Sequence, residues 1–244
     1  MMSMNMTQKF ALVTGAGSGI GRAAARALMT AGYRVALVGR RVEALEETAA
    51  TSAPEQALVL ATDVTDDVAV AAAFARVQAE FGRLDLLFNN AGTGINAPFA
   101  ESDPADWTTM IDANLYGVLH CTQAAVPLMA GRPGAMICSV SSVGGRYGTA
   151  SWSVYSATKF AVVGFSDALR KELGPDGVRV CVLEPGAVRT EFGANVREVM
   201  DERWDSLDAM GPQDVAQALV YAFAQPPNVL VQEIQLRPVL QVAP

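Results

Sequence analysis

Histidine and cysteine are scarce in this chain. It has one histidine, His120, and three cysteines, Cys121, Cys138 and Cys181, with no C-x-x-C pair. A structural zinc site needs four nitrogen or sulfur ligands, and a Ser–His–Asp hydrolase needs a positioned imidazole. These few residues argue against a metal centre. The scattered cysteines also argue against a disulfide framework and favour a reducing compartment.

Basic residues are in the minority as well. Lysine and arginine number 18 against 25 aspartates and glutamates, a formal net charge of −7. Binding to nucleic acid or to an anionic membrane needs a broad positive surface. We therefore expect neither as a partner.

No segment has the pattern of a signal peptide or a membrane span. Residues 1–9 are polar and Met-rich, lack the apolar core of a signal peptide and are expected to be disordered. Ala113–Gly131 carries no charged residue but contains Asn114 and His120, so it predicts a buried helix. These features favour a cytoplasmic location.

Short apolar runs alternate along the chain with longer segments of helical periodicity. Seven runs are interpreted as strands: Phe10–Thr14, Arg34–Gly39, Ala57–Thr62, Leu84–Asn89, Ala135–Ser139, Val178–Leu183 and Val229–Leu236. Nearly continuous apolar runs are typical of strands covered on both faces. The alternation predicts an α/β fold: a Rossmann-type, doubly wound parallel sheet of about seven strands in a three-layer αβα arrangement. Residues 10–240 are expected to form one domain.

A glycine-rich segment, Thr14–Gly21, separates the first predicted strand from the first helix. Gly15, Gly19 and Gly21 are spaced as G-x-x-x-G-x-G. Glycines at this place let the backbone turn tightly and approach a pyrophosphate, and the helix N-terminus offers free N–H groups. The position of the segment favours a dinucleotide-binding turn over a plain loop.

The second predicted strand ends at Arg40 and Arg41, with no acidic residue before Glu43. An NAD-binding fold places an acidic residue near this point, on the ribose 2′-hydroxyl. Two arginines suit a 2′-phosphate instead, through charge-assisted hydrogen bonds. We therefore expect NADP(H) rather than NAD(H). The alternative is that the two arginines only begin a helix and face solvent.

Tyr155 and Lys159 are one helical turn apart in a segment of helical periodicity, so they share a face. A nearby lysine cation favours the phenolate and lowers the tyrosine pKa toward neutral pH. Taken alone, the pair could equally be an exposed aromatic–lysine contact. The polar residues predicted to lie near the pair favour a catalytic role.

Two further polar groups follow strand ends. Ser142 comes just after the fifth predicted strand, and Asn89–Gly92 follows the fourth. In a doubly wound sheet the ligand lies outside the carboxyl ends of the strands. Asn114 stands in an otherwise apolar predicted helix, Ile111–Leu119, where a buried amide needs partners.

These motifs together resemble the short-chain dehydrogenase/reductase family. The resemblance spans about Phe10 to Leu236 and rests, in order, on Thr14–Gly21, Asp63, Asn89–Gly92, Asn114, Ser142, Tyr155, Lys159 and Pro185-Gly186. It implies a catalytic tetrad. Tyr155 would exchange the proton, Ser142 would hold the substrate oxygen, Lys159 would bind the nicotinamide ribose, and Asn114 would anchor a water.

The resemblance also implies contacts along the cofactor. Asp63 would meet the adenine, Asn90 the ribose, and Val188 with Thr190 the carboxamide. The full expected cofactor site is Gly15, Gly17, Ser18, Gly19, Ile20, Gly21, Arg40, Arg41, Asp63, Val64, Asn90, Ala91, Gly92, Tyr155, Lys159, Pro185, Gly186, Val188 and Thr190.

The implied reaction is reversible hydride transfer between NADP(H) and a small-molecule carbonyl or secondary alcohol, with Tyr155 as general acid and base and no metal. A noncatalytic NADP-binding regulator on the same fold is the alternative. The resemblance and the apolar helices favour a homodimer or homotetramer.

The substrate pocket is expected to be mostly small or apolar. Its candidate residues are Gly94, Ile95, Val143–Tyr147, Ser151, Trp152, Gly186 and Ala187, under a lid formed by about residues 190–210. Arg146 is the one obvious cation near the tetrad; it could pair with a substrate carboxylate or face solvent. Glu184 before Pro185-Gly186 resembles the branch with 3-hydroxy acid and serine dehydrogenases, which also contains broad ketone reductases.

Overall fold

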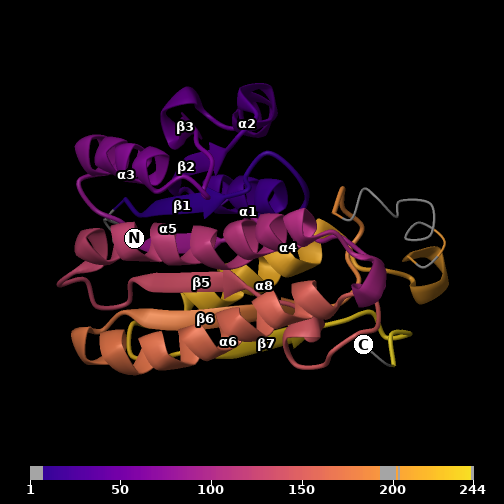
Figure 1. Cartoon of the computed structure of the whole chain (residues 1–244). Coiled ribbons are helices and arrows are strands. Elements are labelled where there is room, and N and C mark those ends of the chain that lie inside the picture. The colour runs from indigo at the N-terminus through magenta and orange to yellow at the C-terminus, as the bar shows by residue number, and fades with distance from the viewer. Residues whose placement is uncertain (1–7, 193–201, 203, 243–244) are drawn as a thin grey trace.

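Seven parallel strands form the centre of the molecule, as the computed structural model of residues 8–192, 202 and 204–242 shows (Figure 1). They are β1 (Phe10–Thr14), β2 (Arg34–Gly39), β3 (Ala57–Ala61), β4 (Leu86–Asn89), β5 (Met136–Val140), β6 (Arg179–Pro185) and β7 (Glu233–Leu236). Their order in the sheet is β3-β2-β1-β4-β5-β6-β7, and every neighbouring pair is parallel. The predicted doubly wound sheet is confirmed.

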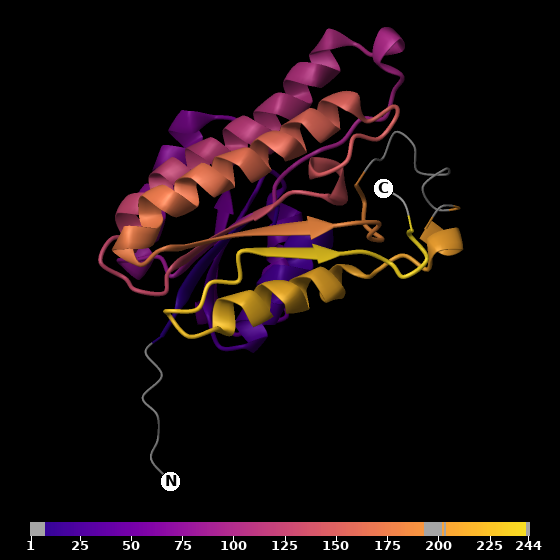
Figure 2. The ribbon, with the colours of Figure 1, turned by 90° about the horizontal axis from the view of Figure 1, so that it is seen from below.

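Helices cover both faces of this sheet (Figure 2). The longer ones are α1 (Gly19–Thr30), α2 (Val42–Ala49), α3 (Asp67–Phe81), α4 (Pro104–Ile111), α5 (Gly117–Met129), α6 (Ser153–Leu173) and α8 (Pro212–Ala224). Helices α1, α2 and α8 contribute to the hydrophobic cluster on one face, and α3, α5 and α6 to the cluster on the other. The result is the expected three-layer αβα arrangement.

The apolar runs are nearly continuous because successive strand residues enter different cores. On β1, Val13 belongs to the cluster that contains Leu28 of α1, whereas Leu12 belongs to the cluster that contains Phe74 of α3. Successive side chains of a strand point to opposite faces, so a strand covered on both sides must be apolar throughout. Burial on both faces therefore explains the sequence pattern.

Helix ends follow local signals. Asp66 accepts a hydrogen bond from the Ala69 N–H, 2.9 Å away, at the start of α3, and Gly82 ends that helix with a φ of 68°. Asp103 caps α4 in the same way, with Pro104 as the first helical residue.

One predicted helix is interrupted. The sequence predicts a helix through Ile111–Leu119, but the chain forms a π-helical turn, η3 (Asp112–Tyr116), between α4 and α5. Such wide turns occur mostly as single-turn bulges, often at functional sites. Asn114 lies in this turn and is fully buried. Its amide finds partners outside the helix, a contact that helical periodicity does not reveal.

The order of the strands predicts a ligand crevice between β1 and β4, at the carboxyl ends of the strands. From β1 the chain winds outward through β2 and β3, and from β4 it winds the other way through β5, β6 and β7. Ligands of such sheets lie outside the carboxyl ends of the strands, at this reversal. Among the described residues, no helix is both long and apolar enough to cross a bilayer.

Candidate active site

A cavity of about 660 Å³ lies at the carboxyl ends of the central strands. It brings together most of the residues that the sequence predicts for the site. These are Gly15, Ser18, Gly19, Ile20, Arg40, Arg41, Asn90, Ala91, Gly92, Ser142, Tyr155, Lys159, Pro185, Gly186, Val188 and Thr190. One cavity therefore connects the glycine turn, the Tyr–Lys pair and the segment after β6.

Five predicted residues are not among those lining this cavity: Gly17, Gly21, Asp63, Val64 and Asn114. The Asp63 carboxylate accepts hydrogen bonds from the N–H and hydroxyl of Thr65, 3.0 and 2.9 Å away. The Val64 carbonyl lies 3.1 Å from Nδ1 of His120. His120 thus has a backbone partner, and the adenine contact of Asp63 stays a prediction.

The glycine turn needs its glycines for two different reasons. Gly15 and Gly19 have φ values of 66° and 47°, which side-chain-bearing residues rarely adopt. At Gly21 a Cβ atom would lie 2.1 Å from the Gly15 carbonyl oxygen. Ser18 lines the cavity and precedes α1 without a side-chain capping bond. The turn fits a pyrophosphate.

Asn90 supports this turn from the end of β4. Its Nδ2 donates to the Thr14 carbonyl at 3.0 Å, and its backbone N–H donates to the Thr14 hydroxyl at 2.9 Å. The Ala91 N–H donates to the same hydroxyl at 2.9 Å. Thr14 therefore ties the glycine turn to the segment after β4, a role that the sequence analysis missed.

Arg40 and Arg41 lie at the end of β2, exposed at the rim of the cavity. Within the described ranges, neither side chain forms an ion pair. Two uncompensated guanidinium groups beside a dinucleotide-sized cleft are suited to a phosphate monoester.

Asn114 forms hydrogen bonds to the loop after β4 and to α6. Its Oδ1 accepts from the Thr93 N–H at 2.8 Å, and its Nδ2 donates to the Thr93 carbonyl at 2.9 Å and to the Thr158 hydroxyl at 3.1 Å. The side chain thus joins the loop that lines the cavity to α6. Its predicted role in holding a water is not tested by these contacts.

Ser142 and Tyr155 both line the cavity. Ser142 follows β5, and its hydroxyl accepts a hydrogen bond from the Gly144 N–H at 3.0 Å and donates to the Pro185 carbonyl at 3.4 Å. Burial raises the pKa of Tyr155 on α6 to about 12, although the side chain of Ser142 acts to lower it.

Lys159 lies one turn beyond Tyr155 and is 5% exposed. Its Nζ donates to the Val140 carbonyl at 2.9 Å and lies 5.6 Å from the centroid of the Tyr155 ring. Burial without a carboxylate partner lowers the lysine pKa to about 8. The expected lowering of the tyrosine pKa by this cation is wrong for the protein alone, because desolvation of the phenolate outweighs it.

The wall beside Tyr155 is aromatic. The ring centroids of Trp152 and Phe192 lie 5.3 and 5.5 Å from that of Tyr155. A Cβ on Gly94 would lie 2.4 Å from Cζ of Phe192, so this contact needs a glycine. Within the predicted lid, Phe192 and Trp204 line the cavity, whereas residues 193–201 and 203 lie outside the described part of the chain.

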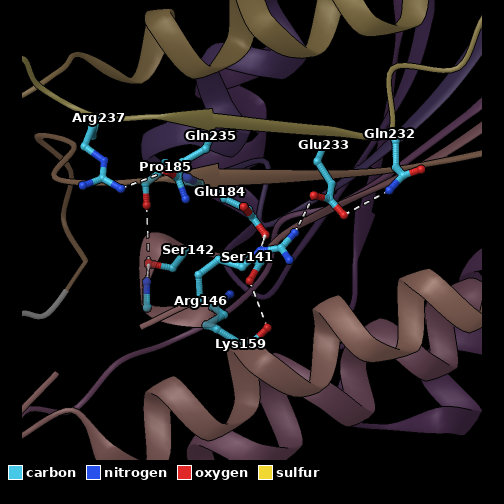
Figure 3. Close-up of polar contacts among 11 residues, drawn as sticks. Ser141, Ser142, Arg146, Lys159, Glu184, Pro185, Gln232, Glu233, Gln235 and Arg237 are labelled. Atoms are coloured by element: carbon cyan, nitrogen blue, oxygen red, sulfur yellow. Dashed lines mark hydrogen bonds and ion pairs between the residues drawn. The ribbon is translucent and has the colours of Figure 1, made fainter. Parts of the chain in front are cut away.

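The Arg146 side chain points toward Glu184 and Glu233 (Figure 3), and Arg146 is not among the residues that line the cavity. Its Nε lies 2.6 Å from Oε1 of Glu184, and its Nη2 lies 2.6 Å from Oε2 of Glu233. Glu184 is buried, and burial raises its pKa against the lowering effect of Arg146. The prediction of a substrate carboxylate as the partner of Arg146 is wrong, because β6 and β7 supply two carboxylates, and the side chain stays 32% exposed to solvent.

The other residues predicted for the substrate pocket fall into two groups. Gly94, Ile95, Val143, Gly144, Trp152, Gly186 and Ala187 line the cavity, whereas Gly145, Arg146, Tyr147 and Ser151 are not among its lining residues. Among the residues described, no cluster of histidine, cysteine, aspartate or glutamate could hold a metal ion. All three cysteines are free and buried.

Gln241 belongs to the cavity wall but was not predicted from the sequence. It comes from the segment after β7, and its Oε1 accepts a hydrogen bond from the Ala187 N–H at 2.9 Å. The signal that could have revealed it is a lone polar residue among apolar neighbours, Val239, Leu240 and Val242.

Known proteins resemble this chain over nearly its whole length. The family model described as short chain dehydrogenase matches residues 9–201. An uncharacterized oxidoreductase of Staphylococcus aureus strain N315 is 38% identical over 234 residues, which are 96% of this chain and 99% of the relative.

Two solved structures share the fold closely. The closed form of serine dehydrogenase complexed with NADP+ is 33% identical, with a TM-score of 0.91 and 96% of each chain covered. An alcohol dehydrogenase from the archaeon Thermococcus sibiricus, complexed with 5-hydroxy-NADP, is 30% identical, with a TM-score of 0.88, over 98% of this chain and 100% of that one.

Proposed function

Because the chain belongs to the short-chain dehydrogenase/reductase family, we propose that it transfers hydride between NADP(H) and a carbonyl or secondary alcohol substrate. The observation that carries this proposal is that Ser142, Tyr155 and the buried Lys159 line the same cavity as the glycine turn. A protein that only bound a nucleotide would have little use for this arrangement.

Tyr155 is the proposed proton donor in the reducing direction. With a pKa of about 12, its hydroxyl is protonated at neutral pH and can donate to a developing alkoxide. Ser142, which lines the same cavity, would hold the same substrate oxygen and orient it. In the reverse direction Tyr155 would take the proton from the alcohol.

Lys159 would stabilise charge next to the tyrosine. Its pKa of about 8 leaves it mostly protonated at pH 7, and its ammonium lies 5.6 Å from the Tyr155 ring centroid. When bound, the nicotinamide supplies the hydride exchange. The protein residues supply orientation, the proton and a partly desolvated site.

NADP(H) is the proposed cofactor. The turn with Gly15 and Gly19, together with Ser18, which makes no side-chain capping bond, would take the pyrophosphate. Arg40 and Arg41 would bind the 2′-phosphate, and the positions next to them at the end of β2 carry no competing carboxylate. The NADP+ in the related serine dehydrogenase structure supports this assignment.

A panel of ketones and secondary alcohols, followed by the absorbance of NADPH, tests the proposal. We expect turnover of at least one ketone, with a higher kcat/KM for NADPH than for NADH. Tight NADPH binding without any turnover would instead support the noncatalytic regulator. A clear preference for NADH would overturn the assignment of the arginines.

A further inference from the structure

Gln241 is the one buried side chain of the described segment after Pro238 that lines the cavity. Its exposed fraction is 6%, whereas those of Val239, Leu240 and Val242 are 95%, 58% and 90%. It lines the same cavity as Ser142 and Tyr155. An amide is thus directed into the site while its apolar neighbours face outward, the reverse of what hydrophobic burial alone would favour.

The orientation of this amide is set by its carbonyl. Oε1 accepts from the Ala187 N–H at 2.9 Å, and a Cβ on the neighbouring Gly186 would lie 2.3 Å from the same oxygen. The glycine is what permits this close approach. Among the residues that the structure describes, Nε2 forms no hydrogen bond. Two N–H donors therefore remain for a ligand in the cavity.

The cavity also has an apolar part. Trp152, Phe192 and Ile95 line it, and the rings of Trp152 and Phe192 stack with their centroids 6.3 Å apart. A pocket with one polar side and one apolar side orients a ligand that has the same two sides.

The charged groups near the Gln241 side balance one another. Arg146 is paired with both Glu184 and Glu233, which leaves one negative charge in excess. Arg237 supplies a second positive charge, because its Cβ would lie 2.9 Å from a Cβ on Gly186, the residue that Gln241 contacts. With two positive and two negative charges there, the neutral amide of Gln241 suits a neutral acceptor.

Resting on the proposed function, we propose that Nε2 of Gln241 binds a neutral hydrogen-bond acceptor of the substrate, next to the reacting carbonyl. The substrate class is then a ketone with an aryl or alkyl arm against Trp152 and Phe192 and a second carbonyl, such as an ester, toward Gln241. A ketone without the acceptor would leave the donors unpaired and so react less efficiently.

Gln241→Glu is the sharpest test, because it keeps an oxygen for the Ala187 N–H and replaces only the donating NH₂. The probes are ethyl 3-oxo-3-phenylpropanoate, butyrophenone, which lacks the ester, and the cationic 3-(dimethylamino)-1-phenylpropan-1-one. For the wild-type protein we expect kcat/KM to be about tenfold higher for the keto ester than for butyrophenone.

At pH 8, Gln241→Glu should remove this preference, lowering kcat/KM for the keto ester about tenfold or more. It should also raise kcat/KM for the cationic ketone, because a carboxylate attracts an ammonium. Gain on one substrate and loss on another cannot come from a merely damaged fold. Gln78→Glu, the same change on the exposed surface of α3, should alter neither preference.

Several results would overturn the inference. Equal losses on all three ketones would show that Gln241 only supports the backbone at Ala187. A wild-type preference for acetoacetate over its ethyl ester would overturn the choice of a neutral acceptor. Absence of wild-type turnover on every ketone would instead overturn the proposed function, and this inference with it.

Discussion

The two ends of the cavity differ in the exposure of their positive charges. At the open end, after β2, Arg40 and Arg41 are exposed and make no ion pair within the described part of the chain. At the closed end, between β5 and α6, Lys159 is buried and Ser142 is hydrogen-bonded on two sides. Substitutions at the open end should therefore change affinity, and those at the closed end should change chemistry and stability.

Two cations near the closed end, only one of which lines the cavity, have different surroundings. Lys159 has a backbone carbonyl as its partner, and burial lowers its pKa to about 8. Arg146 lies between two carboxylates, and the hydrogen bond to Glu233 raises its pKa. A cation without a carboxylate partner costs stability and stays available to a ligand, whereas a paired cation joins elements of the fold.

Tyr155→Phe should have the largest effect. Removing the proposed proton donor is expected to lower kcat about 10²- to 10⁴-fold. Fluorescence titration should show NADPH binding close to that of the wild type, because the glycine turn and both arginines remain. Tyr147→Phe, at an exposed position on the neighbouring loop, is the control and should keep its activity. Retained turnover in Tyr155→Phe would refute the role of this tyrosine.

Replacing both Arg40 and Arg41 by alanine tests the open end. Loss of the charge-assisted contacts should raise KM for NADPH about 10- to 100-fold and leave KM for NADH nearly unchanged. The difference between wild type and variant should shrink at high salt, since exposed charges are screened. Arg76→Ala, on the exposed surface of α3, is the matched control. Equal losses with both cofactors would contradict the comparison.

Lys159→Met should have the smallest of the three effects. It should raise the free energy of unfolding, whereas most substitutions lower it. The folded-state pKa, about 8, lies below the ordinary 10.5, so the unfolded chain binds more protons between these values. Stability therefore rises with pH in this window, and below it the buried ammonium is a cost. At pH 7 the variant should be more stable by about 1–2 kcal/mol, although inactive.

Urea denaturation at pH 7 and pH 10 measures this effect. The gain of Lys159→Met should shrink at pH 10, where the wild-type lysine is neutral in the folded protein. Lys171→Met, an exposed lysine of α6, should show no such dependence. A variant less stable than the wild type at pH 7 would mean that the bond to the Val140 carbonyl outweighs the desolvation of the ammonium.

Much of the site could be predicted because its signals are local. The glycine turn, the arginines after β2 and the Tyr155–Lys159 pair each lie within one short segment, where spacing along a strand or helix sets their relation. Apolar runs covered on both faces likewise predict all seven strands, although β7 begins at Glu233 rather than at the predicted Val229. For these features the covalent order of residues and their burial requirements are sufficient.

Other features depend on contacts between distant segments. Arg146 finds Glu184 and Glu233 because β6 and β7 pair in register beside the loop after β5. Asn114 lies in the π-helical turn and accepts a hydrogen bond from the Thr93 N–H. Gln241, which follows β7, accepts one from the Ala187 N–H. No spacing along the sequence encodes these partners. A hydrogen bond or ion pair is chosen by which groups packing brings within about 3 Å, and that choice exists only in the folded chain.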